Sequence, residues 1–199
     1  GVTRDYVLGL KVVLPTGEKI ETGVKTAKGV VGYDLTRLLI GSEGTLGIIT
    51  EMTLKLISLP EAVRTMTAVF HEVGKAAETV SEIIRRGIVP RTIEFMDRAS
   101  IICVENYLKI GLPIDAGALL LIEVDGRAEE AESAINRLEK LCINLGAREV
   151  AIAKTKEEAT VIWKARKAIS PALFTYAPDK INEDIVVPRS RIPDMVRRI

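Results

Sequence analysis

The order of apolar and polar positions divides the chain into two regions with different patterns of expected strands and helices. In the first region, runs of apolar residues favour short strands, and a turn from Pro15 to Gly17 joins the first two. A glycine-punctuated loop and a short helical pattern over residues 33–40 precede the third strand. The expected strands cover residues 6–14, 19–22 and 48–57. Leu59 and Pro60 close this region, so the pattern predicts a domain over residues 1–59 and another over residues 60–199.

From residue 63 onward, short apolar strands alternate with amphipathic helices. Strands are expected over residues 63–70, 92–96, 117–124 and 148–153, with a further one opening at Lys180. Helices are expected over residues 73–86, 98–110, 128–145 and 156–169, the last ending at Ser170 and Pro171. The turn residues favour a mostly antiparallel sheet with helices packed on it, which is an α+β fold. A doubly wound parallel sheet is the alternative topology.

Composition and charge exclude several classes of protein. Apolar residues make up 47% of the 199 positions, which is enough to bury a core and excludes general disorder. The formal net charge is +1, so no broad field is expected that would attract nucleic acid or an anionic membrane. No apolar run reaches the roughly 18 residues of a transmembrane helix. Cys103 and Cys142 lie in apolar helical patterns, which predicts buried, reduced thiols of a cytosolic protein.

The two ends of the chain suggest that it continues. Gly1 is not preceded by methionine, and a strand pattern follows almost at once. Residues 190–194 (SRIPD) have the cap and proline of a helix start, yet the chain stops at Ile199. We therefore expect a piece of a longer polypeptide; a short C-terminal docking helix is the alternative.

The strongest local motif is GSEGTLG at residues 41–47. Three glycines spaced by three let the backbone pass close to a ligand and turn its N–H groups towards it, and Ser42 and Thr45 add hydroxyls. Such a segment suits a phosphate or pyrophosphate. A strand follows it rather than a helix, so it is neither a P-loop nor a dinucleotide-binding fingerprint. A tight turn that enters a central strand is equally compatible with this spacing.

Residues 25–50 (KTAKGVVGYDLTRLLIGSEGTLGIIT) closely resemble the second half of the FAD-binding domain in the vanillyl-alcohol oxidase superfamily of FAD-linked oxidases. The resemblance is strongest to the glycolate oxidase and D-lactate dehydrogenase branches. It continues through EFMD at 94–97, WKAR at 163–166 and KINEDIVVPRSR at 180–191, and so covers essentially the whole chain. The family usually has Asn-Val-Ala where Gly29, Val30 and Val31 stand, and losing that amide side chain is expected to weaken cofactor binding.

The resemblance implies the positions of two sites. Six residues of the glycine-rich segment would lie on the FAD side: Gly41, Ser42, Gly44, Thr45, Gly47 and Ile49. Arg166 and Lys180 would face the carboxylate of a small 2-hydroxy acid, with a hydrogen bond from Ser170. Without the resemblance, the two cations would be solvated charges among 28. Asp34 and Arg37 are expected to form a helical ion pair rather than a catalytic one.

No catalytic base or metal ligand is assigned within this chain. His71 is the single histidine, and it is expected at the surface or at a strand edge. In the resembling enzymes, the base and the metal ligands lie in a histidine-containing segment nearer the C-terminus. The first half of the FAD domain would lie upstream of Gly1.

These observations predict a fragment of an FAD-dependent dehydrogenase or oxidase that transfers a hydride from a D-2-hydroxy acid, such as glycolate or D-lactate, to flavin. Residues 1–59 would be the C-terminal part of the FAD-binding domain, and residues 60–199 a truncated, ferredoxin-like substrate or cap domain. The isolated fragment would be inactive and would not retain FAD. Its partners would be the rest of its own chain and an electron-acceptor protein or sister subunits. The expected location is the cytoplasm, peripheral to the membrane through those subunits. The alternative is a non-enzymatic α+β module that presents a sheet face to a partner protein.

Overall fold

A computed structural model describes residues 2–24, 26 and 28–198, which belong to two compact units, Gly1–Leu59 and Pro60–Ile199. Three residues named in the sequence analysis lie outside the described residues. They are Lys25, at which the resemblance over residues 25–50 begins, and Gly1 and Ile199, at the ends of the predicted domains.

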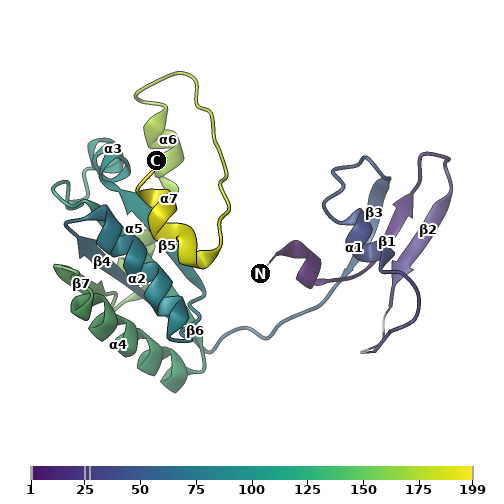
Figure 1. Ribbon diagram of the computed structural model, residues 1–199, viewed down its shortest axis with the longest axis horizontal. Helices are drawn as coiled ribbons and strands as arrows, with labels where there is room; N and C mark the ends of the chain where they lie inside the picture. Colours follow the sequence, from purple (N-terminus) through teal and green to yellow (C-terminus); the bar gives the residue numbers. More distant parts are fainter. Residues whose placement is uncertain (1, 25, 27, 199) are drawn as a thin grey trace. The chain divides into compact units, whose positions relative to one another are not determined.

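Unit 1 is a three-stranded antiparallel sheet with one short helix (Figure 1). Its elements are η1 (Thr3–Asp5), β1 (Val7–Val13), β2 (Lys19–Gly23), α1 (Leu35–Leu39) and β3 (Ile48–Leu54). The strand order is β2-β1-β3, and the predicted turn closes the β1–β2 hairpin with Gly17 at φ +87°. The carboxylate of Asp34 accepts a hydrogen bond from the N–H of Arg37 and lies 3.3 Å from its guanidinium, which is the helical pair expected from the sequence.

The core of unit 1 is thin. Only Leu10, Val12 and Leu39 are fully buried apolar residues there among the described positions. Strand β3 is at the edge of the sheet rather than at its centre, and it ends at Leu54, three residues earlier than the pattern predicts. The apolar residues that follow, Leu56 and Ile57, are exposed. Although both residues are apolar, they belong neither to a strand nor to the buried core of this unit.

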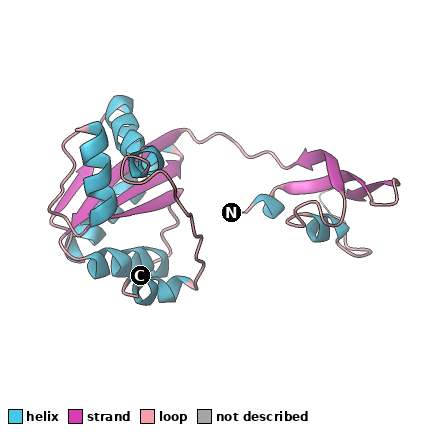
Figure 2. Ribbon diagram, turned by 90° about the horizontal axis from the view of Figure 1, so that it is seen from above, coloured by secondary structure: helices cyan, strands magenta, loops and turns pink. Residues whose placement is uncertain are grey.

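Unit 2 is built on a four-stranded sheet with helices on both faces (Figure 2). Its strands are β4 (Ala62–Phe70), β5 (Thr92–Asp97), β6 (Ala118–Gly126) and β7 (Glu149–Ile152). Its helical elements are α2 (Val73–Arg85), α3 (Arg98–Leu108), α4 (Ala128–Asn144), α5 (Lys156–Lys167), α6 (Ile169–Leu173), η2 (Arg189–Arg191) and α7 (Ile192–Val196). The order β5-β6-β4-β7 has every neighbouring pair antiparallel. The α+β prediction is confirmed, and the parallel alternative is wrong.

Alternate residues of the central strands pack against different helices. Leu120 and Ile122 of β6 belong to a core with residues of α2 and α4, including Ile83 and Leu138. Leu119 points to the opposite face and belongs to a second core with residues of α3, α5 and α6. We call this second side of the sheet the α5 face. Strand β6 is thus buried on both faces, which explains why its sequence is almost continuously apolar.

The two cysteines belong to different cores, Cys142 to the first and Cys103 to the second. Both are buried and free, as predicted. Burial raises the pKa of the Cys142 thiol to about 12 and also raises that of Cys103. Neither thiol has the lowered pKa that a reactive cysteine requires.

The C-terminal part of unit 2 differs from the sequence prediction at two points. Helix α5 ends at Lys167, and Ser170 and Pro171 lie inside the next short helix, α6. Proline is tolerated there because the first turn of a helix has N–H groups without helical partners. The strand expected to open at Lys180 is not formed; this residue lies in a long loop between α6 and η2. The predicted helix start is confirmed as α7, with Pro193 in its first turn.

An ion pair between Asp115 and Arg148 connects the loop before β6 to the start of β7, and it predicts a pH-dependent stability. The hydrogen bond from Arg148 holds the pKa of Asp115 at about 2, below its ordinary value of 3.8. Because the pKa is lower in the folded chain, the stabilisation is complete above about pH 4 and is lost as the pH falls towards about 2. As the pH falls through that window, the free energy of unfolding of the Asp115→Asn variant is therefore expected to decrease less steeply than that of the wild-type protein.

The measurement is urea unfolding at a series of pH values, followed by the fluorescence of Trp163. This is the single tryptophan of the chain, and it reports on unit 2. Parallel pH dependences for the two proteins would contradict the prediction.

Candidate functional site

The glycine-rich segment of unit 1 is a turn with an unusual backbone. Gly41, Glu43 and Gly44 all have positive φ, at +87°, +51° and +79°. The Thr45 hydroxyl donates to the carbonyl of Ser42 at 2.6 Å, and the Thr45 N–H donates to the same oxygen at 3.0 Å. The hydroxyl of Thr45 therefore holds the turn itself.

Several backbone N–H groups of this turn remain available. Within the described part of the chain, those of Glu43, Gly44 and Leu46 donate to no protein acceptor. A Cβ built on Gly41 or Gly44 would meet nothing within 4 Å, so open space lies beside the backbone at both positions. Free N–H groups beside open space are what a phosphate or another acceptor-rich ligand requires. The turn is thus compatible with both alternatives derived from its sequence, a phosphate-binding segment and a tight turn that enters a strand.

Two other residues of the predicted FAD side have different surroundings. A Cβ on Gly47 would lie 2.7 Å from the Val12 side chain and 2.9 Å from the Val13 carbonyl, so this glycine permits close packing against β1. Ile49 is in β3, and its side chain is partly exposed.

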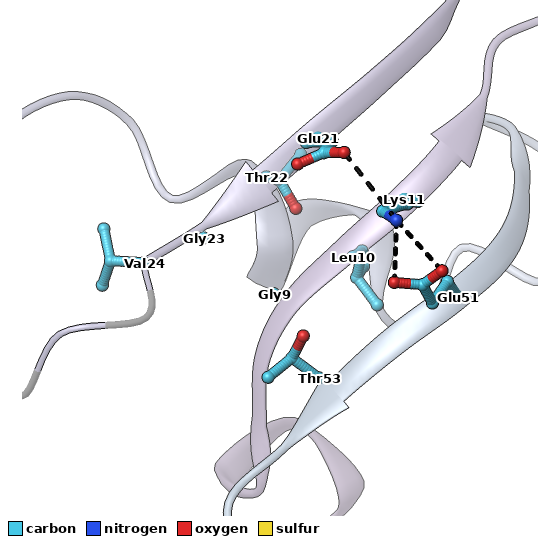
Figure 3. Close-up of a pocket in the computed structure, with 9 residues that line it drawn as sticks. All are labelled: Gly9, Leu10, Lys11, Glu21, Thr22, Gly23, Val24, Glu51 and Thr53. Atoms are coloured by element: carbon cyan, nitrogen blue, oxygen red, sulfur yellow. Dashed lines mark hydrogen bonds and ion pairs between the residues drawn. The ribbon is translucent and has the colours of Figure 1, made fainter.

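A small cavity of about 100 Å³ lies on the sheet of unit 1 (Figure 3). At its centre, the Lys11 ammonium lies 2.9 Å from Glu51 and 4.0 Å from Glu21, on the two neighbouring strands. The hydrogen bond to Glu51 raises the pKa of Lys11. Since two carboxylates surround this one cation, the cavity offers no free positive charge to an anionic ligand.

Helix α5 of unit 2 carries the predicted arginine, and its start is fixed by capping contacts. Thr155 accepts a hydrogen bond from the N–H of Glu158 at 3.2 Å, and the Glu158 carboxylate accepts one from the N–H of Lys154 at 2.7 Å. The first contact satisfies an N–H group that the first helical turn leaves unpaired, and the second holds the chain just before the helix. The register of α5, and with it the direction of Trp163 and Arg166, is set from this end.

A buried carboxylate of the sheet anchors the middle of α5. Glu123 of β6 is only 7% exposed. Its Oε2 accepts hydrogen bonds from the Trp163 indole N–H at 2.7 Å and from the Thr65 hydroxyl at 3.0 Å. Its other oxygen lies 3.5 Å from the Arg91 guanidinium. These partners compensate for burying the charge of Glu123. The same hydrogen bonds connect β6 to α5 and to β4.

A second carboxylate holds Arg166 one turn further along α5. The Nε of Arg166 donates to Oε2 of Glu94, on β5, at 2.6 Å. Among the described residues, this is the single hydrogen bond of the guanidinium, so both terminal NH₂ groups are free. The two side chains are partly buried, at 38% and 29% exposure. The arginine is therefore oriented by the sheet while its terminal donors remain available.

The other two predicted substrate residues contact each other. The Lys180 ammonium donates to the Ser170 hydroxyl at 2.6 Å, and it lies 5.3 Å from the centroid of the Phe174 ring. Ser170 follows Arg166 by four positions, with the break between α5 and α6 at Ala168. Lys180 and Ser170 are thus in contact, and Arg166 lies close to Ser170 in sequence on the preceding helix. We call these three residues the cation cluster.

Other features of the described chain lie apart from the cation cluster. An open groove of about 1370 Å³ is lined by residues of β4, β7, α4 and α5, but not by Arg166, Ser170 or Lys180. His71 is exposed, directly after β4, where the sequence prediction puts it. No group of three or more His, Cys, Asp or Glu side chains could hold a metal ion in the part that the structure describes. Within that same part, none of the helices combines the length and apolar character needed to cross a bilayer.

Sequence reasoning assigned no role to Glu94 or Glu123. The signal for Glu123 was present, because it is the one charged residue in the apolar run from Ala118 to Val124. Glu94 lies in the EFMD segment that carries the resemblance, but its contact with Arg166, 72 positions away, is made only through the fold.

Comparison with known proteins identifies relatives over the whole chain. The family described as FAD linked oxidases, C-terminal domain, matches residues 59–199. The glycolate oxidase subunit GlcD of Bacillus subtilis is 49% identical over 199 residues, covering 100% of this chain and 42% of the relative. A D-lactate dehydrogenase of Anaerostipes hadrus is 35% identical, covering 98% of this chain and 43% of the relative. The chain therefore spans about two fifths of the length of these curated relatives.

Solved structures show the same fold at low sequence identity. An alkyldihydroxyacetonephosphate synthase has a TM-score of 0.65 at 21% identity, over 88% of this chain and 35% of its own. A p-cresol methylhydroxylase has a TM-score of 0.63 at 13% identity, over 85% of this chain and 40% of its own. These structures share the fold, and the family match over residues 59–199, most of the chain, shows that the chain belongs to the FAD linked oxidases.

Proposed function

We propose that the intact protein is an FAD-dependent oxidoreductase that removes a hydride from a D-2-hydroxy acid of the glycolate or D-lactate type. The observation that carries the proposal is the cation cluster, in which Lys180 and Ser170 are in contact and Arg166, four positions before Ser170, keeps its terminal donors free. The names of the relatives, a glycolate oxidase subunit and a D-lactate dehydrogenase, support the same substrate class.

The cofactor side of the proposal rests on the glycine-rich turn. Its free N–H groups and the open space at Gly41 and Gly44 fit the approach of FAD. Following the resemblance, we also assign Ser42, Thr45, Gly47 and Ile49 to the FAD side, where the Thr45 hydroxyl would hold the turn and Gly47 would allow its close packing against β1. Bound FAD supplies the hydride acceptor. At this turn the protein would hold the cofactor by its backbone N–H groups.

The cation cluster would bind and orient the substrate. The terminal NH₂ groups of Arg166 can hold both oxygens of a carboxylate, and Lys180 adds a positive charge to the same anion. The Ser170 hydroxyl can hold the substrate hydroxyl or a carboxylate oxygen. Fixing the carboxylate fixes the neighbouring carbon, from which the hydride leaves while the hydroxyl proton passes to a base, giving a 2-oxo acid. We assign no base among the described residues.

We further propose that unit 1 is the C-terminal part of an FAD-binding domain and that unit 2 is most of a substrate domain. On this interpretation, the remaining length of the intact protein completes the flavin site and supplies the base. We place the protein in the cytoplasm, with sister subunits or an electron-acceptor protein as partners that hold it at the membrane periphery.

The proposal is tested by flavin reduction in the full-length protein under anaerobic conditions. Glycolate or D-lactate is expected to bleach the flavin absorbance, whereas the 199-residue chain alone should carry no flavin after gel filtration, because one wall of a cleft leaves most of a ligand in water. A yellow full-length protein that no 2-hydroxy acid reduces would contradict the proposed substrate. A yellow 199-residue chain would contradict the assignment of unit 1 as an incomplete cofactor site.

A further inference from the structure

Glu123 is a buried charge that takes no part in the proposed chemistry. It lies on the central strand β6, directly opposite Thr65 of β4, and both residues are buried. A buried carboxylate costs free energy even when it is paired, and an apolar residue of similar volume is often as stable in its place. Packing of the core therefore does not account for a glutamate at this position, and its partners indicate what it does.

One hydrogen bond of Glu123 reaches beyond the sheet. The Thr65 hydroxyl at 3.0 Å belongs to the sheet itself, whereas the Trp163 indole N–H at 2.7 Å belongs to α5. Trp163 precedes Arg166 by three positions, so the two side chains lie on the same side of the helix. Glu123 therefore holds α5 about one turn before the arginine of the cation cluster.

Helix α5 has little apolar packing that could hold it in place instead. Among its residues, all of which the structure describes, only Ala165 is fully buried. A methyl group makes few contacts, so it resists a shift of the helix less than large interdigitating side chains would. The capping contacts fix where α5 begins, but not where it lies on the sheet. That position depends on the two helix-to-sheet hydrogen bonds described above, of which the one to Glu123 does not involve Arg166 itself.

We propose that Glu123 is a positioning residue of the substrate site: through the Trp163 indole it fixes the place of α5 on the sheet, and thereby the place of the Arg166 guanidinium. The inference rests on the proposed function. Without this contact α5 would shift relative to the sheet, and the substrate carboxylate would be held away from its productive position. A misplacement of about 1 Å can lower a rate about 100-fold, so a smaller shift is also measurable.

The test uses the full-length, FAD-loaded protein and the Trp163→Phe variant, which keeps an aromatic ring and removes the N–H donor. Its kcat/KM for D-lactate is expected to fall about tenfold at unchanged flavin content. The matched control is Thr65→Val, which removes the other hydrogen bond to the same oxygen of Glu123 but no contact with α5. It should keep kcat/KM within about threefold of the wild-type value.

A double-mutant cycle with Arg166→Lys separates positioning from a general loss of stability. If Trp163→Phe acts through Arg166, its effect on kcat/KM should shrink to about twofold or less in the Arg166→Lys background, because the contact that it misplaces is already lost. Glu123→Ala, which removes the acceptor instead of the donor, should show the same dependence on Arg166. A purely structural role would give the same fold loss in both backgrounds.

Equal fold losses in the two backgrounds would overturn this inference and leave the proposed function intact. Wild-type kcat/KM in Trp163→Phe, or a loss of the same size in Thr65→Val, would overturn it in the same way. A wild-type protein that oxidises no 2-hydroxy acid would overturn the proposed function and this inference with it.

Discussion

Arg166→Lys in the full-length protein is expected to lower kcat/KM for glycolate or D-lactate about 30-fold or more, on the order of 2 kcal/mol. Arginine can donate Nε to Glu94 and present both terminal NH₂ groups to a carboxylate at the same time. A lysine ammonium is a single point that cannot keep both contacts, so the substrate carboxylate would be held less firmly and its neighbouring carbon displaced.

The control is Lys167→Ala, because Lys167 is the adjacent cation on α5 and is exposed to solvent. It should keep wild-type kinetics, since removing an exposed charge has little effect. Steady-state kinetics of both variants, with flavin content measured on the same samples, makes the comparison. Equal and wild-type-like kcat/KM in the two variants would remove Arg166 from the substrate site.

Gly44→Val in the full-length protein is expected to abolish flavin binding while unit 2 stays folded. Gly44 has φ +79°, a conformation that a β-branched residue adopts only at a cost of about 1–2 kcal/mol or more. Nothing of the protein lies within 4 Å of a Cβ there, so the valine side chain would fill space that we assign to the cofactor. Two effects, a strained turn and an obstructed surface, then act against the same ligand.

Gly17→Val separates backbone strain from the loss of cofactor contact. Gly17 has a similar φ, +87°, and a Cβ there also meets nothing within 4 Å, but it lies in the turn of the β1–β2 hairpin. Flavin absorbance and limited proteolysis are measured on both variants, with Trp163 fluorescence as the check on unit 2. Loss of flavin in both variants alike would attribute the effect to unfolding of unit 1, and normal flavin in Gly44→Val would make this turn an ordinary one.

The elements that the sequence predicts correctly are those whose local pattern and tertiary environment agree. The apolar run of β6 is buried on both faces, and the helix that begins after Glu72 has apolar residues at the spacing that its core contacts require. The predicted end of β3 is wrong because Leu56 and Ile57 look like strand residues but have no strand partner in this unit. Apolar character alone does not say whether a neighbouring strand is present.

The candidate site was predicted only where residues resemble a known motif. Arg166, Ser170 and Lys180 came from that resemblance. The strand expected at Lys180 is wrong, because this residue lies in the loop between α6 and η2 and has no strand to pair with. The anchoring role of Glu94 could not be read from the sequence, because it depends on which strand lies under α5. Pairings between distant residues are set by topology, which local patterns do not contain.

The place of β4 in the sheet of unit 2 also governs how this unit can fold. β4 is the first strand of the unit in sequence, yet it lies between β6 and β7, and Met66 pairs with both Ile122 and Ile152. No strand of this sheet pairs through a tight hairpin, since a helix separates each strand from the next. During synthesis on the ribosome, β4 could pair with both of its neighbours only after most of the unit has been synthesised. The closure of long chain segments would then set the pace of folding, as it does in proteins of high contact order.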